Sequence, residues 1–173
     1  GELFLLGPSL QGRTCISGQA CAFPTPLGKF LFNTDSYMVL ETCGIAGSLV
    51  KGLPDGGMLS GDNTTGCQGG NCELTFGTTI VTAPGGQYQL CWCSGPTCIR
   101  EEHFVVTSGA FVLIGPEALN LGRTCIAGQS CVVDDVVAWS WENDTSDTLA
   151  ILDTCGKRQM AYTTHAVHGV PSF

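Results

Sequence analysis

A cysteine-containing motif occurs twice in this chain, and this internal repeat constrains the fold more than any other feature. Residues 12–21 read GRTCISGQAC, and residues 122–131 read GRTCIAGQSC. Two further blocks repeat in the same order, one before the motif and one after it: LFLLGP at 3–8 with FVLIGP at 111–116, and VLETCG at 39–44 with ILDTCG at 151–156. Three ordered blocks give a period of about 108–112 residues, which predicts two tandem copies of one domain.

The two copies have unequal lengths. We place a complete domain at residues 1–108 and an abbreviated second copy at residues 109–173. Beyond Cys155 the second copy has no counterparts of five cysteines of the first: Cys67, Cys72, Cys91, Cys93 and Cys98. The complete copy is therefore expected to be more heavily cross-linked than the short one.

The eleven cysteines predict disulfides rather than a zinc site, because their spacings do not fit the paired knuckles that zinc usually takes. Proximity and the repeat favour five bridges: Cys15–Cys21, Cys43–Cys91, Cys67–Cys72, Cys93–Cys98 and Cys125–Cys131. Other connectivities stay open, since eight cysteines in one copy can pair in many ways. Cys155 is left over, which predicts either a free thiol or an intermolecular disulfide.

The cysteine content also predicts an oxidising compartment, so we expect an extracellular protein that is secreted or held at the cell surface. Two N-glycosylation sequons, at Asn63 and Asn143, agree with this location and predict N-linked glycans. The N-terminal ELFLLGP lacks a basic region and a cleavage site, so we interpret it as the start of a mature chain. No apolar run reaches the length of a membrane helix.

Short β-rich runs separated by Gly, Pro, Asn or Asp predict an all-β protein. Their number favours two tandem immunoglobulin-like β-sandwich repeats, the second of them abbreviated. The most informative run is GGQYQLCWC at residues 85–93. Side chains alternate faces along a strand, so Tyr88, Leu90 and Trp92 are expected to face the core. The two cysteines of this run then lie on the other face, where we expect them to staple the strand to outer loops.

Together, the motifs GP…GRTCxxGQxC…VL[ED]TCG…GQYQLCWC resemble repeats in large secreted or surface proteins of single-celled eukaryotes, especially dinoflagellates and related alveolates. The resemblance covers nearly all of the first copy and the first half of the second. It implies tandem, extracellular, disulfide-rich modules of immunoglobulin-like fold, and it supplies no catalytic residue. The shortened second copy departs from the pattern, so the resemblance defines its fold less well.

The junction between the copies has a counterpart at the two ends of the chain. Residues 103–116 read HFVVTSGAFVLIGP, and the C-terminal HGVPSF followed by the N-terminal GELFLLGP aligns with them without a gap. We therefore expect head-to-tail contacts, either between subunits or within a longer tandem chain; such contacts give filaments when they do not close into a ring. The expected assembly interface has seven apolar or proline residues: Leu3, Phe4, Leu5, Leu6, Val170, Pro171 and Phe173.

Few residues are candidates for chemistry. Trp139 and Trp141 share one face of an extended segment, where they form either a glycan platform or part of a core or interface. His165 and His168 lack a third metal ligand, so a surface position is favoured. No nucleophile elbow, HExxH motif or phosphate loop occurs, so we expect neither an enzyme nor a cofactor. The net charge of −8 argues against nucleic acid as a partner.

These features favour a structural role over a catalytic one. We expect a glycosylated subunit of an extracellular filament, appendage or surface coat, whose main partner is itself. The alternative is an adhesion or glycan-binding module of a cell-surface protein, which would use the two tryptophans or the Gly-rich loops.

Overall fold

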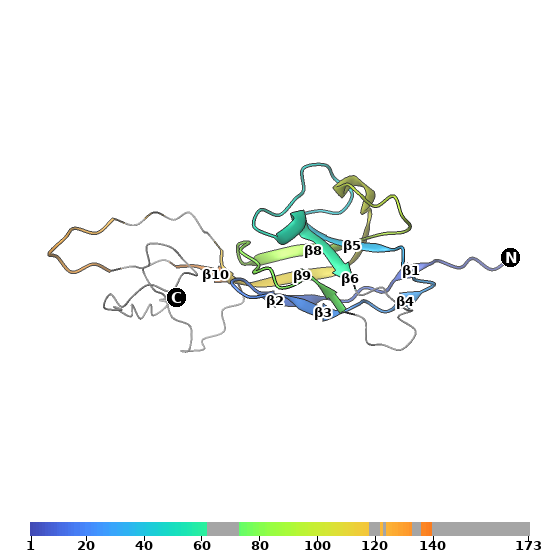
Figure 1. Ribbon diagram of the computed structural model, residues 1–173, viewed down its shortest axis with the longest axis horizontal. Helices are drawn as coiled ribbons and strands as arrows, with labels where there is room; N and C mark the ends of the chain where they lie inside the picture. The colour runs from blue at the N-terminus through green and yellow to red at the C-terminus, as the bar shows by residue number, and fades with distance from the viewer. Residues whose placement is uncertain (62–72, 118–121, 123, 133–135, 140–173) are drawn as a thin grey trace.

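The computed structural model describes residues 1–61, 73–117, 122, 124–132 and 136–139, and within these ranges the chain is all-β with two short 3-10 turns (Figure 1). The described strands are β1 (Gly7–Pro8), β2 (Arg13–Ile16), β3 (Ala22–Pro24), β4 (Gly28–Lys29), β5 (Ser36–Leu40), β6 (Met58–Gly61), β7 (Glu73–Thr75), β8 (Gly86–Cys93), β9 (Val106–Pro116) and β10 (Ala138–Trp139). The turns are η1 (Pro54–Gly57) and η2 (Glu101–His103). Across these ranges, no helix has the length and hydropathy needed to cross a membrane.

Most of these strands join one sheet. Its pairing follows the order β10-β9-β8-β5-β6-β7-β3, and β2 pairs with β9 outside this path. β1 and β4 form a separate two-stranded sheet. At the centre, β8 is antiparallel to both β5 and β9. Because β-strands are pleated, the alternate side chains of β8 point to opposite faces of the sheet.

The large sheet curls around a hydrophobic core. Phe23 of β3, at the far end of the pairing path, has its ring centroid 5.9 Å from that of Phe111 in β9. Phe76 approaches the same ring edge-on, with centroids 6.5 Å apart. β6 pairs with β5 on one side and with β7 on the other, so the strand pairing is continuous. The structure confirms the predicted all-β class, and the β-sandwich arrangement stays a prediction.

Both faces of β8 are covered. Tyr88, Leu90 and Trp92 lie in the main core, on the face predicted from the alternation. The opposite face carries a second, smaller cluster, which consists of Met38, Leu40, Cys91, Cys93, Cys98 and Phe104. The outer face is therefore a packed layer along the second half of the strand, which explains why LCWC at its end is buried on both sides of the pleat, whereas Gln87 nearer its start is exposed.

Tyr88 ties the start of β8 to the preceding turn. Its hydroxyl donates a hydrogen bond to the carbonyl oxygen of Pro84 at 2.9 Å. This bond runs from the strand back to the backbone four residues upstream, and so fixes the turn that precedes β8.

β9 runs through the predicted domain boundary between residues 108 and 109. Its first part pairs with β8, where Val106 is opposite Trp92, and the antiparallel pairing continues to Leu113 opposite Gly86. Its residues from Phe111 onward also pair in parallel with β2. The residues that begin the second sequence copy therefore complete the sheet of the first copy.

Gly109 makes this continuity possible. Its φ angle is 141°, and a Cβ atom at this position would overlap the backbone of Gln11. Glycine is needed here because L side chains rarely adopt this backbone conformation and because the chain before β2 passes directly against β9. The Ser-Gly pair in the middle of the run is thus a point of close backbone approach, and the strand does not end there.

Candidate functional site

Four disulfides occur in the described residues. They join Cys15 to Cys21, Cys43 to Cys91, Cys93 to Cys98 and Cys125 to Cys131, with Cα–Cα distances of 5.8, 5.6, 5.8 and 5.6 Å. These are four of the five pairs that the sequence favoured. The fifth pair, Cys67 with Cys72, and the leftover Cys155 lie outside the described residues.

Two of these bridges hold the outer layer of the sheet. The Cys43–Cys91 bridge ties the middle of β8 to the segment that follows β5. The Cys93–Cys98 bridge closes the loop at the end of β8. Both place their sulfur atoms in the second apolar cluster, so the cysteines serve as core side chains as well as cross-links.

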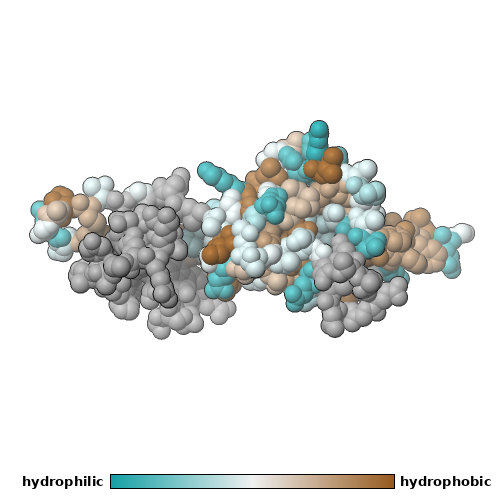
Figure 2. All heavy atoms as spheres, in the orientation of Figure 1, coloured by the Kyte–Doolittle hydropathy of each residue, from teal (hydrophilic) through white to brown (hydrophobic). Residues whose placement is uncertain are grey.

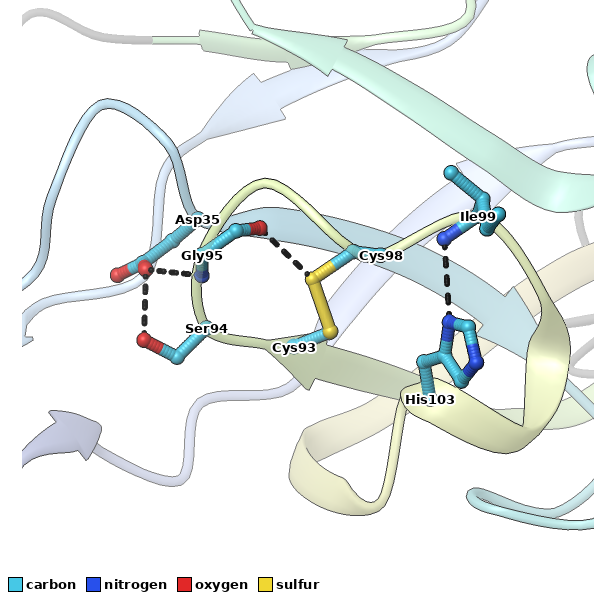
Figure 3. The surroundings of a disulfide bond; sticks show 7 residues. All are labelled: Asp35, Cys93, Ser94, Gly95, Cys98, Ile99 and His103. Atoms are coloured by element: carbon cyan, nitrogen blue, oxygen red, sulfur yellow. Dashed lines mark hydrogen bonds between the residues drawn. A yellow bond between two sulfur atoms is a disulfide. The ribbon is translucent and has the colours of Figure 1, made fainter.

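Beside the second bridge lies a buried carboxylate, that of Asp35 (Figure 3). Its Oδ1 atom accepts hydrogen bonds from the Ser94 hydroxyl at 3.1 Å and from the Gly95 amide at 3.2 Å. Its Oδ2 atom accepts a third bond, from the amide of Phe32 at 2.9 Å. A carboxylate that holds three donors of its own chain fixes the loops around the disulfide, and these bonds occupy both of its oxygens.

His103 has a similar local role. Its Nδ1 atom accepts a hydrogen bond from the amide of Ile99 at 3.3 Å, which closes the turn between the Cys93–Cys98 loop and η2 (Figure 3). His165 and His168 lie outside the described residues. Among the residues that the structure describes, no group of three His, Cys, Asp or Glu side chains is arranged to hold a metal ion.

The buried tyrosines are protonated structural groups. Burial raises the pKa of the Tyr37 phenol well above its ordinary value, and the neighbouring Asp35 carboxylate raises it further. Burial also raises the pKa of Tyr88, with a smaller contribution from Glu41. Both phenols therefore keep their protons at physiological pH, and their role is structural: Tyr37 packs in the core, and Tyr88 also donates a hydrogen bond.

The N-terminal segment leaves the sheet as an exposed apolar chain. Leu3, Phe4, Leu5 and Leu6 are 87%, 66%, 83% and 56% exposed. Figure 2 shows apolar residues gathered on this extension, beside β1 and β4. These four residues are the N-terminal part of the predicted assembly interface. The C-terminal part, Val170, Pro171 and Phe173, lies outside the described residues.

The strongest structural sign of the repeat is a matching pair of strand contacts. In the first copy, Gly7 and Pro8 of β1 pair antiparallel with Lys29 and Gly28 of β4. In the second copy, the sequence counterparts of Gly7 and Pro8 are Gly115 and Pro116, which pair antiparallel with Trp139 and Ala138 of β10 in the same register.

The same equivalence extends to the next hydrogen bond. The amide of Ser9 donates to the carbonyl oxygen of Leu27 at 2.7 Å, and the amide of Glu117 donates to that of Val137 at 2.9 Å. The sequence analysis missed the β1–β4 and β9–β10 pairs. The signal that could have found them was the equal spacing from Cys21 to Gly28 and from Cys131 to Ala138.

Trp139 lies in β10 opposite Gly115 and is 36% exposed. Its predicted companion, Trp141, lies outside the described residues, as do both predicted glycosylation positions, Asn63 and Asn143. The structure thus places one of the two tryptophans, at the edge strand that follows the repeat junction.

The fold and its cross-links define a disulfide-rich all-β protein with an internal cysteine repeat. Among curated proteins, the chain is similar to a protein named Cysteine repeat modular protein B from Toxoplasma gondii, with 27% identity over 158 residues. The match takes in 88% of this chain and 2% of that relative, so the chain spans a small fraction of the relative's length. The likeness supports a cysteine-rich repeat protein of alveolate type. No family model matches the chain, and no solved structure matches it.

Proposed function

We propose that this chain is a structural repeat unit of an extracellular filament, appendage or surface coat, in which units follow one another head to tail. The observation that carries the proposal is β9. One strand completes the sheet of the first copy and then enters the second copy through a Gly–Pro pair whose contacts repeat those of β1 and β4. A shared strand of this kind suits a protein whose function is to connect units.

Several features support an extracellular structural role rather than catalysis. Disulfides persist in oxidising compartments, and the relative is also named as a cysteine-repeat protein. The buried Asp35 carboxylate and the histidine at 103 are engaged in loop contacts. A filament or coat also benefits from bridges that limit unfolding outside the cell, where the chain has no access to chaperones.

Electron microscopy of the native material tests this proposal. We expect regular filaments or a coat, with a repeating unit whose size corresponds to small β-domains. A soluble monomer that stays dispersed at all concentrations and in the native extract would overturn the structural role. Mass spectrometry of the same material checks for glycans at Asn63 and Asn143 and for the pairing state of Cys155.

An adhesion or glycan-binding role is the second candidate, and the partly exposed Trp139 is the observation that favours it. Indole rings stack on sugar rings when they are accessible. A glycan array with the full chain tests it: binding that is lost in Trp139→Ala and kept in Phe32→Ala, another exposed aromatic position, would support this role. Absence of binding to any glycan leaves the structural proposal as the better account.

A further inference from the structure

Residues 1–6 have a structurally described counterpart in the same chain. The sequence repeat aligns Gly1 with Gly109 and the following residues with Ala110 to Ile114, which form the middle of β9. We propose that residues 1–6 are a linking strand, by which we mean the last strand in the sheet of a repeat that precedes them in the same polypeptide. This inference rests on the proposed function and names the physical connection between units.

The alternation of side chains supports this assignment. In β9, Phe111 and Leu113 are fully buried in the main core, whereas Val112 and Ile114 are partly exposed. The counterparts of the two buried residues are Leu3 and Leu5, the most exposed apolar residues of the linking strand. An apolar pattern with the correct period is therefore present at the positions where β9 fills a core.

The geometry at the end of the linking strand is also that of β9. Gly7 has a φ angle of 138° and Gly115 one of 153°, a region that favours glycine. In the first copy, the amide of Gly85, just before β8, donates to the carbonyl oxygen of Pro116 at 2.7 Å. Pro8 is the counterpart of Pro116. In the proposed arrangement, the residue of the preceding repeat that corresponds to Gly85 would donate the same hydrogen bond to the carbonyl oxygen of Pro8.

A repeat in the same polypeptide is the favoured acceptor. β9 connects its two copies without a break, and it lies between β8 and β2 with strands on both sides. A strand in this position is flanked on both edges, which favours its arrival by chain continuity over capture from another molecule. The charge of the segment also fits a buried strand, since Glu2 is its one ionisable side chain.

A fusion protein tests the linking strand. Residues 7–108 are placed directly before Gly1 of the full chain, so that residues 1–6 follow Ser108 as residues 109–114 do in the original. We expect the backbone amides of residues 2–6 to exchange with deuterium at least about 100-fold more slowly than in the unfused chain. Residues 110–114, present in both proteins, report whether the original sheet is folded.

Matched variants separate strand docking from general burial. In the fusion, Leu3→Asp with Leu5→Asp should abolish the protection, whereas Phe4→Ser with Leu6→Ser should keep most of it, since the first pair corresponds to core positions. In the unfused chain, both double variants should leave the melting temperature unchanged. Equal effects of the two pairs in the fusion would overturn the assignment of faces.

A second variant protein keeps the test decisive if the added repeat does not fold. In the full chain, Ala110→Glu, Phe111→Leu, Val112→Phe and Ile114→Leu together put the linking-strand sequence into β9. We expect cooperative unfolding to survive this exchange, and to be lost when the same residues are inserted one position out of register. Loss in both of these variants would overturn the proposal.

Other outcomes identify which idea fails. Concentration-dependent protection of residues 2–6 in the unfused chain would mean that a second copy accepts the strand, which overturns the same-chain assignment. Protection in the fusion without filaments in micrographs of the native material would keep the linking strand and remove the structural role. Filaments in the native material, together with unprotected residues 2–6 in the fusion, would keep the structural role and overturn the linking strand.

Discussion

At the scale of single residues, the buried polar atoms separate into those with partners and those without. Asp35, on the loop before β5, has three hydrogen-bond donors. Within the described residues, the hydroxyl groups of Tyr37 and Ser108 and the indole nitrogen of Trp92 are buried with no hydrogen-bond partner. An unpaired buried polar atom costs stability, so it can be removed without loss where the substitution leaves no cavity, as at the small side chain of Ser108.

Ser108→Ala should therefore leave the free energy of unfolding unchanged or raise it by up to about 1 kcal/mol, because it removes a fully buried hydroxyl without a partner. The matched control is Ser48→Ala. The Ser48 hydroxyl is also buried but donates to the carbonyl oxygen of Ile45 at 2.6 Å, so its removal should cost about 1 kcal/mol. Urea unfolding measures both, and a larger loss for Ser108→Ala than for Ser48→Ala would contradict this account.

Glu101 gives a pH-dependent contact. Its carboxylate accepts a hydrogen bond from the amide of Gly47 at 3.0 Å, which lowers its pKa below the ordinary value. The stabilising contribution is thus present above the ordinary carboxyl pKa and is lost as the pH falls through the lowered pKa of the folded state. The NMR shift of the Gly47 amide should titrate with a midpoint below that of an ordinary glutamate. Glu101→Gln should abolish this titration, and a midpoint at or above the ordinary value would refute the contact.

At the scale of elements, the sequence predicted β8 better than β9. Alternation along residues 86–93 correctly assigned Tyr88, Leu90 and Trp92 to the core, because each face of that strand has its own set of neighbours. β9 was instead divided at residue 109, because the domain boundary was placed between the two copies of the sequence repeat. The glycine of β9 is needed because the backbone of Gln11 passes close to Gly109. This contact is between residues far apart in the sequence, so the local sequence pattern does not reveal it.

Substitution of Gly109 tests this explanation. Gly109→Ala should lower the free energy of unfolding by about 3 kcal/mol, because it adds both a strained backbone angle and an overlap with Gln11. Gly18→Ala is the control, since Gly18 also has a positive φ, of 87°, but has open space around it. The control should cost only about 1 kcal/mol. If chemical denaturation shows that both variants lose the same free energy of unfolding, the close approach to Gln11 does not contribute to the cost at Gly109.

At the scale of the whole molecule, the cysteine pairing was more predictable than the sheet topology. Neighbouring cysteines and the repeat identified Cys15–Cys21, Cys93–Cys98 and Cys125–Cys131, and elimination then identified Cys43–Cys91. The sheet is continuous because β6 pairs with β5 on one edge and with β7 on the other. Which strands pair, and in which register, is set by tertiary packing, so the sequence pattern of single strands did not predict it. The pairing of β10 with β9 was missed although the sequence carries a signal for it, because Ala138 follows Cys131 at the same spacing as Gly28 follows Cys21.

The bridges should differ in their contribution to stability because they close loops of different length. Cys43–Cys91 spans 48 residues and Cys93–Cys98 spans 5. Chain entropy alone gives about 4 kcal/mol for the longer loop and about 2 kcal/mol for the shorter one. We therefore expect the double variant Cys43→Ser with Cys91→Ser to unfold at a lower urea concentration than Cys93→Ser with Cys98→Ser. The reverse order would show that packing in the second cluster, rather than loop closure, decides the effect.

A strand that belongs to two units also determines how the protein responds to tension. When the chain is pulled at its ends, the load enters β9 along its axis, where β8 resists on one side and β2 on the other. Hydrogen bonds that are loaded along a strand must break together, whereas those of a hairpin peeled from one end break one at a time. A flexible Gly/Ser linker would extend before its neighbouring domains carried any force. The continuous junction has no such extensible segment. A series of such units would therefore resist extension from the start, and the disulfides would limit how far each unit could unfold under force.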